Sequence, residues 1–101
     1  MSEEAEKYKK RIANAIKTIG NIFGYEVELK EENKIVLRSL YAFDEEDIFI
    51  LQISEKGISV ERNAYLKKFE KERALYLDQG KSIGAFLSAV TLSLFEQSTF
   101  Q

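Results

Sequence analysis

Apolar residues recur at alternating steps of three and four along residues 3–23, with mostly charged and polar residues between them. This spacing places them on one side of an α-helix, which turns once every ~3.6 residues. Kept for about two and a half heptads, it is also the a/d spacing of a coiled coil. The predicted seam consists of Ala5, Tyr8, Ile12, Ala15, Ile19 and Ile22. We therefore expect two copies of the chain to join here, the alternative being an ordinary amphipathic helix packed on a sheet.

Ile16 and Phe23 form a second apolar stripe beside this seam, near the end of the helix. We expect that flank to pack on the chain's own globular part, while the seam meets a partner helix. A helix of about twenty residues is about 30 Å long, which is enough to project from a small domain. The pattern therefore divides the chain into a coiled-coil stem helix over 1–23 and a globular head over 24–101.

Four short apolar segments follow the stem, and each is typical of a β-strand. They cover residues 25–30, 34–41, 48–53 and 58–61. The first alternates apolar and charged residues, as a half-buried strand does. The third is nearly continuous in apolar residues and is expected at the centre of the sheet. Short turns between successive strands predict an antiparallel meander, and Gly24 can take the left-handed conformation that ends the stem helix.

Two helices are predicted after the strands. Asn63 caps a charged helix that runs to Gln79 and ends at Gly80. Its inward side consists of Leu66, Phe69, Arg73 and Leu77. A second helix over 81–95, with Ser82 as its N-cap, is apolar almost all round and is therefore expected to be buried. One helix, four strands and two helices predict an α+β two-layer sandwich.

Composition excludes several kinds of chemistry. The 101 residues support one domain, with 45% hydrophobic and 32% charged residues. A net charge of −2 gives no general attraction to nucleic acid. The chain has no Cys and no His, so it lacks thiol redox chemistry, Cys/His zinc sites and the commonest acid–base catalyst. We expect no enzyme activity, no cofactor, no metal, and no nucleic-acid or membrane partner.

Three polar motifs are candidates for binding. Lys9, Lys10 and Arg11 form a basic cluster on the stem helix that can bind a phosphate or a carboxylate, although a solvated helix face is the alternative. The acidic run 44–47 lacks the spacing of a calcium loop and is expected to be a solvated turn. In the polar tail after residue 95, Thr99 is within reach of a kinase.

Four stretches of the chain resemble a known family. They are Gly24-Tyr25, Leu37-Arg-Ser-Leu-Tyr-Ala42, the helix from Ser82 to Phe95, and Gln97-Ser-Thr99. Together they resemble the C-terminal domains of the mitotic arrest deficient protein one family, which are long coiled-coil proteins of the spindle assembly checkpoint. The likeness covers nearly the whole chain, and the apolar helix is its most specific part.

The resemblance implies a parallel homodimer of stem helices that carries two heads of the RWD-like kind. It implies a non-catalytic adaptor in the nucleus that helps bring the checkpoint complex to unattached kinetochores by binding a phosphorylated Bub-family kinase. It also implies phosphorylation at the place of Thr99, which helps present the coactivator of the anaphase-promoting complex. The alternative is an RWD-type interaction module of another kinetochore or ubiquitin-pathway assembly.

The chain departs from the family at one motif. The family's kinase-binding element is an Arg-Leu-Lys triplet in the stem helix, and it should fall at 3–5, where this chain has Glu-Glu-Ala. No Arg-Leu-Lys triplet occurs elsewhere in the chain. Either Lys9, Lys10 and Arg11 replace it, or the partner is recognised differently, or the sequence begins after the element.

Overall fold

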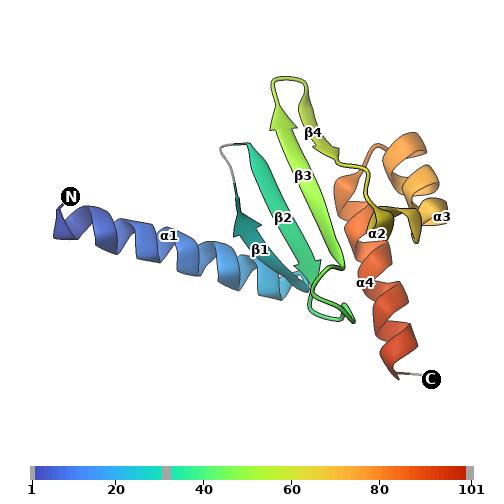
Figure 1. The fold of residues 1–101 in the computed structure, drawn as a ribbon, viewed down its shortest axis with the longest axis horizontal. Helices are drawn as coiled ribbons and strands as arrows, with labels where there is room; N and C mark the ends of the chain where they lie inside the picture. The colour runs from blue at the N-terminus through green and yellow to red at the C-terminus, as the bar shows by residue number, and fades with distance from the viewer. Residues whose placement is uncertain (1, 31–32, 100–101) are drawn as a thin grey trace.

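The computed structural model describes residues 2–30 and 33–99, and of residues 98 and 99 it describes the backbone alone. The elements are α1 (Glu3–Ile22), β1 (Tyr25–Leu29), β2 (Lys34–Ser39), β3 (Ile48–Ser54), β4 (Gly57–Val60), α2 (Ala64–Lys67), α3 (Glu70–Glu72), the π-helix η1 (Arg73–Gln79) and α4 (Ile83–Thr99). The predicted α+β class, with an N-terminal helix, a four-stranded antiparallel sheet and C-terminal helices, is confirmed. Figure 1 shows α1 extending from one side of the sheet, with α2, α3 and α4 gathered toward the other.

The strands form one antiparallel sheet in the order β1-β2-β3-β4, which confirms the predicted meander. Leu37 lies opposite Phe49 in the β2–β3 ladder. Leu51 lies opposite Val60 in the β3–β4 ladder. Because side chains alternate between the two faces of a strand, this register gathers the apolar residues on one face. The predicted central strand, β3, pairs on both sides.

Phe49 lies at the centre of the core and has 0% of its surface exposed. Its ring centroid is 5.0 Å from that of Tyr65 and 5.3 Å from that of Phe86. The buried core comprises Tyr25, Leu37, Phe49, Leu51, Tyr65, Leu66, Phe69, Phe86, Val90 and Leu94. Aromatic pairs at these distances add to the stabilisation that burial gives. The rings of Phe49, Tyr65 and Phe86 thus join the sheet to α2 and α4.

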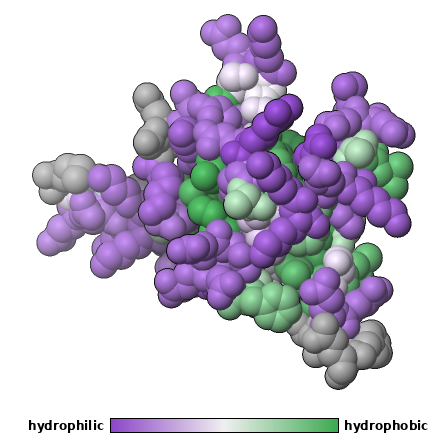
Figure 2. Space-filling view, turned by 45° about the vertical axis from the view of Figure 1, so that its right-hand side comes forward, coloured by the Kyte–Doolittle hydropathy of each residue, from purple (hydrophilic) through white to green (hydrophobic). Residues whose placement is uncertain are grey.

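The apolar helix α4 is buried on one face only. Phe86, Val90 and Leu94 are buried, as predicted, but Leu92 is 61% exposed and Phe95 is also exposed. The prediction that the helix is buried on most sides is therefore wrong for the isolated chain. The sheet and η1 cover one side of α4, and within residues 2–30 and 33–99 no third layer covers the other side. On the face shown in Figure 2, exposed hydrophobic residues lie as separate areas among hydrophilic ones.

The segment 64–79 is a broken helix, whereas a continuous one was predicted. The cap at Asn63 is confirmed, because its Oδ1 accepts from the N–H of Leu66 at 2.8 Å. Its Nδ2 also donates to the carbonyl of Ile48 at 2.9 Å, which ties α2 to β3. The helix breaks at Phe69, where φ is −120° and ψ is 39°. The Phe69 ring packs there against Tyr65, at a centroid distance of 5.2 Å, so core packing outweighs local helix propensity.

The link between η1 and α4 differs in one respect from the prediction. Gly80 ends η1 but has an ordinary φ of −78°, and Lys81 takes a left-handed φ of 51°. The N–H of Ser82 donates to the carbonyl of Tyr76 at 2.8 Å, which satisfies a terminal carbonyl of η1. The Ser82 hydroxyl then accepts from the N–H of Ala85 at 3.0 Å, so its predicted role as N-cap of α4 is confirmed.

The contact between α1 and β1 depends on Gly20, the one buried residue of α1. A Cβ atom at this position would lie 2.6 Å from the carbonyl oxygen of Tyr25 and 2.7 Å from Cγ2 of Val27. Only glycine therefore lets the helix approach the strand this closely. Gly24 then reverses the chain into β1 with a φ of +88°, as predicted. This close contact fixes the direction in which the rest of α1 leaves the head.

Candidate protein-interaction surface

The predicted seam of α1 lies in solvent. Ile12 is 59% exposed and Ile22 is 73% exposed, and Tyr8 and Ile19 are similarly open. The helix itself is well formed, since the Ser2 hydroxyl accepts from the N–H of Ala5 at 3.3 Å and acidic residues occupy the first turn. None of these large apolar seam residues is buried in the chain's own head. In water, such a stripe favours a partner that removes it from solvent.

The second stripe of α1 packs only in part as predicted. Ile16 is half-buried and faces the head, whereas Phe23 is 71% exposed. The prediction for Phe23 is therefore wrong. Phe23 is the C-cap of α1, with φ of −91° and ψ of 0°, so the chain turns away there before the side chain reaches the sheet. The buried Gly20 makes the contact with the sheet that was expected of Phe23.

An apolar groove adjoins the seam. It has a volume of about 490 Å³ and lies between the end of α1, the β1 side of the sheet and the start of α4. Its lining consists of Ile16, Ile19, Gly20, Phe23, Tyr25, Val27, Leu37, Gly84, Leu87 and Ser88. Ile19 belongs to both the seam and this groove, so the two form one continuous apolar surface. The apolar residues of α4 predict a buried helix, but their spacing does not predict a groove beside that helix.

One hydrogen bond joins β1 to α4 at this groove, and a second lies within α4. The Tyr25 hydroxyl donates to the carbonyl of Leu87 at 2.6 Å, and the Thr91 hydroxyl donates to the same carbonyl at 2.9 Å. Burial raises the pKa of Tyr25 to about 12, because loss of solvent disfavours the phenolate. The hydrogen bond with Thr91 acts in the opposite direction and lowers this pKa. Tyr25 therefore stays protonated and remains a donor over the physiological range.

The basic cluster of Lys9, Lys10 and Arg11 lies on the exposed part of α1. Successive residues of a helix point about 100° apart, so these three side chains diverge around the helix. One copy of the chain therefore does not direct all three at a single phosphate. In heptad terms, Lys9 and Arg11 flank the seam on its two sides, and Lys10 lies opposite it.

The remaining predicted sites give mixed results. In the acidic run, three residues are exposed as predicted, but Asp47 is buried, and its Oδ2 accepts from the N–H of Asp44 at 3.1 Å.

Thr99 is the last residue of α4, so the polar tail is helical to that point. The Thr99 side chain lies outside the described residues. Among residues 2–30 and 33–99 no cluster of three potential metal ligands is present.

No helix in the described ranges has the length and apolar content to cross a bilayer. The chain matches the model of a known protein family. The family is Mad, described as mitotic checkpoint protein, and its model matches residues 5–99, which include both stem and head. The chain belongs to the Mad family of mitotic checkpoint proteins. The resemblance carried by the four stretches is thus confirmed.

Membership of the Mad family indicates a role in the spindle checkpoint of mitosis. Proteins of this family are generally non-enzymatic adaptors. Among curated protein sequences, none matches this chain. A spindle checkpoint adaptor acts through surfaces that bind other proteins, so the exposed seam and the groove beside it are the features of this Mad-family chain to explain.

Proposed function

We propose that the chain is a dimeric, non-catalytic adaptor of the spindle assembly checkpoint, joined through the seam of α1. The exposure of Ile12, Ile19 and Ile22 on a helix that projects from the head carries this proposal. A large aliphatic side chain stabilises by about 1.5–3 kcal/mol when it is fully buried. A second copy of α1 would bury all of these residues at once.

The charges beside the seam favour a parallel arrangement. With Ala5, Ile12 and Ile19 at a positions, Glu4 falls at a g position and Lys9 at the following e position. In a parallel coiled coil a g residue pairs with the next e residue of the other helix. Glu4 of one copy would therefore face Lys9 of the second copy, twice per dimer, and both heads would lie at the same end.

The proposed dimer also places the two basic clusters at one level of the stem. Lys10 and Arg11 of both copies would surround the coiled coil, with Lys9 close by. Cationic groups on both helices suit a phosphorylated partner, since charge-assisted hydrogen bonds to phosphate are stronger than neutral ones. We propose a phosphorylated Bub-family kinase as this partner, which would bring the checkpoint complex to unattached kinetochores in the nucleus.

Thr99 is the proposed phosphorylation site. Its position at the end of α4 supports a switch, because a phosphate at a helix C-terminus opposes the helix dipole. Phosphorylation would loosen the last turn of α4 and free the tail to contact the coactivator of the anaphase-promoting complex.

Sedimentation of purified chain tests the dimer. We expect the unsubstituted protein to sediment as a dimer at micromolar concentration, and Ile12→Asp or Ile19→Asp to give folded monomers. Asn14→Asp is the matched control, because it adds the same charge at an exposed position away from the seam. A monomeric unsubstituted protein, or an Ile12→Asp variant that still dimerises, would contradict the proposal.

Titration with a peptide from a Bub-family kinase tests the partner. The phosphorylated peptide should bind and the unphosphorylated one should not. Reversal of Lys9, Lys10 and Arg11 to Glu should weaken binding about tenfold or more, since each charged hydrogen bond contributes ~1.5–3 kcal/mol. Lys17→Glu, on the same helix, should leave the affinity within about twofold. Equal affinity for the two peptides would reject phosphate recognition while leaving the dimer intact.

A further inference from the structure

The strand β4 forms one edge of the sheet, and its outer side is unpaired within the described residues. Glu61 donates its N–H to the carbonyl of Ile50 at 2.8 Å, in continuation of the β3–β4 ladder. Hydrogen-bonded and non-hydrogen-bonded residues alternate along an antiparallel strand. The N–H and C=O groups of Ile58 and Val60 therefore point away from β3. Such a row of free backbone groups is a template for another strand.

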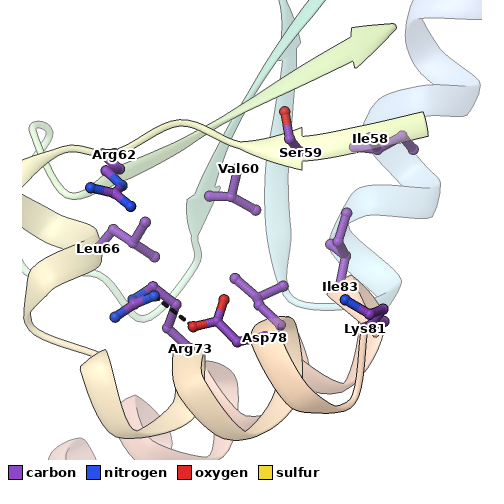
Figure 3. Close-up of a pocket in the computed structure, with 10 residues that line it drawn as sticks. Ile58, Ser59, Val60, Arg62, Leu66, Arg73, Asp78, Lys81 and Ile83 are labelled. Atoms are coloured by element: carbon purple, nitrogen blue, oxygen red, sulfur yellow. Dashed lines mark hydrogen bonds and ion pairs between the residues drawn. The ribbon is translucent and has the colours of Figure 1, made fainter. Parts of the chain in front are cut away.

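A groove runs along this free edge. It has a volume of about 400 Å³ and is bounded by β4 on one side and by η1 and the start of α4 on the other. In Figure 3, Ile58 and Val60 lie across it from Arg73, Asp78 and Ile83, whereas the Ser59 side chain points away from them. The apolar side chains of Val60, Leu66, Leu77 and Ile83 are among its lining residues. The groove thus combines free backbone groups with apolar contacts.

Cationic side chains outnumber anionic ones in this groove. Arg62, Arg73 and Lys81 line it, against the single carboxylate of Asp78. Asp78 is already engaged, since its Oδ2 accepts from Nη1 of Arg73 at 2.8 Å. Arg62 and Lys81 are exposed, and neither makes an ion pair within the described part of the chain. A chain with a net charge of −2 therefore presents a positive groove beside a free strand edge.

Lys81 occupies a backbone conformation that favours glycine. Its φ is 51°, while the neighbouring Gly80 has an ordinary φ of −78°. Glycine is the usual residue at the left-handed position that ends a helix, because other residues are strained there. Strain of this kind tends to occur at functional sites. Here it places a lysine at the wall of the groove, opposite the end of β4 where Ile58 lies (Figure 3).

We propose that the β4 groove binds an extended acidic segment of a partner protein, which adds a strand to the edge of the sheet. Strand addition gains affinity from backbone hydrogen bonds and specificity from side-chain contacts. A segment of about four residues, about 13 Å long, matches the length of β4. Its carboxylates would lie against Arg62 and Lys81. A second copy of this chain would bring the same cations together, so charge complementarity disfavours self-pairing at this edge.

This site is separate from the proposed dimer interface. β4 lies at the opposite edge of the sheet from β1, the strand on which α1 packs. The groove therefore remains open when two stems associate, and each head would offer one copy of it.

Nuclear magnetic resonance of the full, nitrogen-labelled chain tests the proposal. The probe is an acetylated and amidated six-residue peptide of alternating valine and glutamate. We expect it to shift the amide signals of Ile58 and Val60 and to slow their hydrogen exchange. The same peptide with lysine in place of glutamate, and a version with N-methylated valines that cannot pair as a strand, should both bind at least about threefold more weakly.

Lys81→Gly separates binding from stability. It should lower the affinity for the glutamate peptide about two- to fivefold, as expected for loss of one partly exposed charge contact. It should also raise the Tm by a few degrees, because it removes the left-handed strain. Arg62→Gln should weaken binding to a similar degree. Lys17→Gln, on α1, is the charge-matched control and should leave binding unchanged.

Three results would overturn the proposal. They are peptide-induced shifts confined to residues outside β4 and the groove, equal affinity for the glutamate and lysine peptides, and slow exchange at Ile58 without peptide. The last would show that a second copy already occupies the edge. A monomeric stem, by contrast, would reject the proposed dimer and leave this site unaffected.

Discussion

The helices α1 and α4 both carry many apolar residues, but the fold uses them differently. In α4, Phe86 and Val90 have 0% of their surface exposed and belong to the core that the helix shares with the sheet. In α1, Ile12 and Ile19 are spaced just as regularly and remain exposed. The regular pattern in each helix predicts a buried face, but it does not say which molecule covers it. A strongly apolar stripe left in solvent by a complete core is the signature of an interface.

The largest loss of stability is expected from a substitution on the core face of α4. Phe86→Ala should lower the free energy of unfolding by about 3–5 kcal/mol, because it removes a buried ring and leaves a cavity. Phe95→Ala, on the exposed side of the same helix, should cost less, since Phe95 is 43% exposed and its ring has an edge contact with Tyr41 at 5.6 Å between centroids. Urea denaturation at one protein concentration measures both. Similar costs at the two positions would contradict the assignment of faces.

Substitution of Gly20 tests the contact between α1 and the head. Gly20→Ala should destabilise the protein by about 1–3 kcal/mol, since the added methyl has no room beside Tyr25 and Val27. Gly84→Ala, in α4, is the matched control. A methyl there meets nothing closer than 3.9 Å, so that variant should gain about 0.5–1 kcal/mol from lower backbone entropy in the unfolded chain. Stability of both variants follows from thermal unfolding, and a neutral Gly20→Ala would mean that α1 can shift on the sheet.

The hydrogen bond between β1 and α4 should contribute less to the free energy of unfolding than the Gly20 contact does. Tyr25→Phe should cost about 0.5–1.5 kcal/mol at neutral pH, because the Leu87 carbonyl keeps its bond from Thr91. Tyr25 ionises at a pKa of about 12 when folded, compared with about 10 when unfolded. The folded state therefore holds the proton more tightly, and the stabilisation is complete below pH ~10 and lost between about 10 and 12.

Burial also raises the pKa of Tyr65 to about 12, so the unsubstituted protein should lose stability at both tyrosines over this range. In Tyr25→Phe, the fall in unfolding free energy between pH 9 and pH 11 should be shallower than in the unsubstituted protein. An identical pH profile would show that the Tyr25 hydroxyl is not buried in solution.

The smallest expected effect is on the affinity of the dimer, and it tests whether the two stem helices run parallel. Glu4→Lys or Lys9→Glu alone should weaken the dimer by about 0.3–0.5 kcal/mol for each of the two pairs. The double exchange should restore the affinity, because the charges are swapped and still complementary. Dimer dissociation constants at low salt measure the effect. An additive loss in the double variant would indicate that the two helices do not run parallel.

Local patterns in the sequence determined most of the fold. The spacing along 3–23, the four strand segments and the caps at Asn63 and Ser82 all depend on neighbours within a few residues, so the chain alone specifies them. Membership of the Mad family was likewise visible in short stretches, and the family match over residues 5–99 agrees with it.

Only the tertiary structure decided which apolar residues are covered. Phe23 and Leu92 match their buried neighbours in type and spacing, yet both are largely exposed because no element among the described residues covers them. The break at Phe69, the left-handed Lys81 and the open edge of β4 also follow from long-range packing, in which core contacts outweigh local preference. The positive groove exists because folding brings Arg62, Arg73 and Lys81 together at one edge of the sheet.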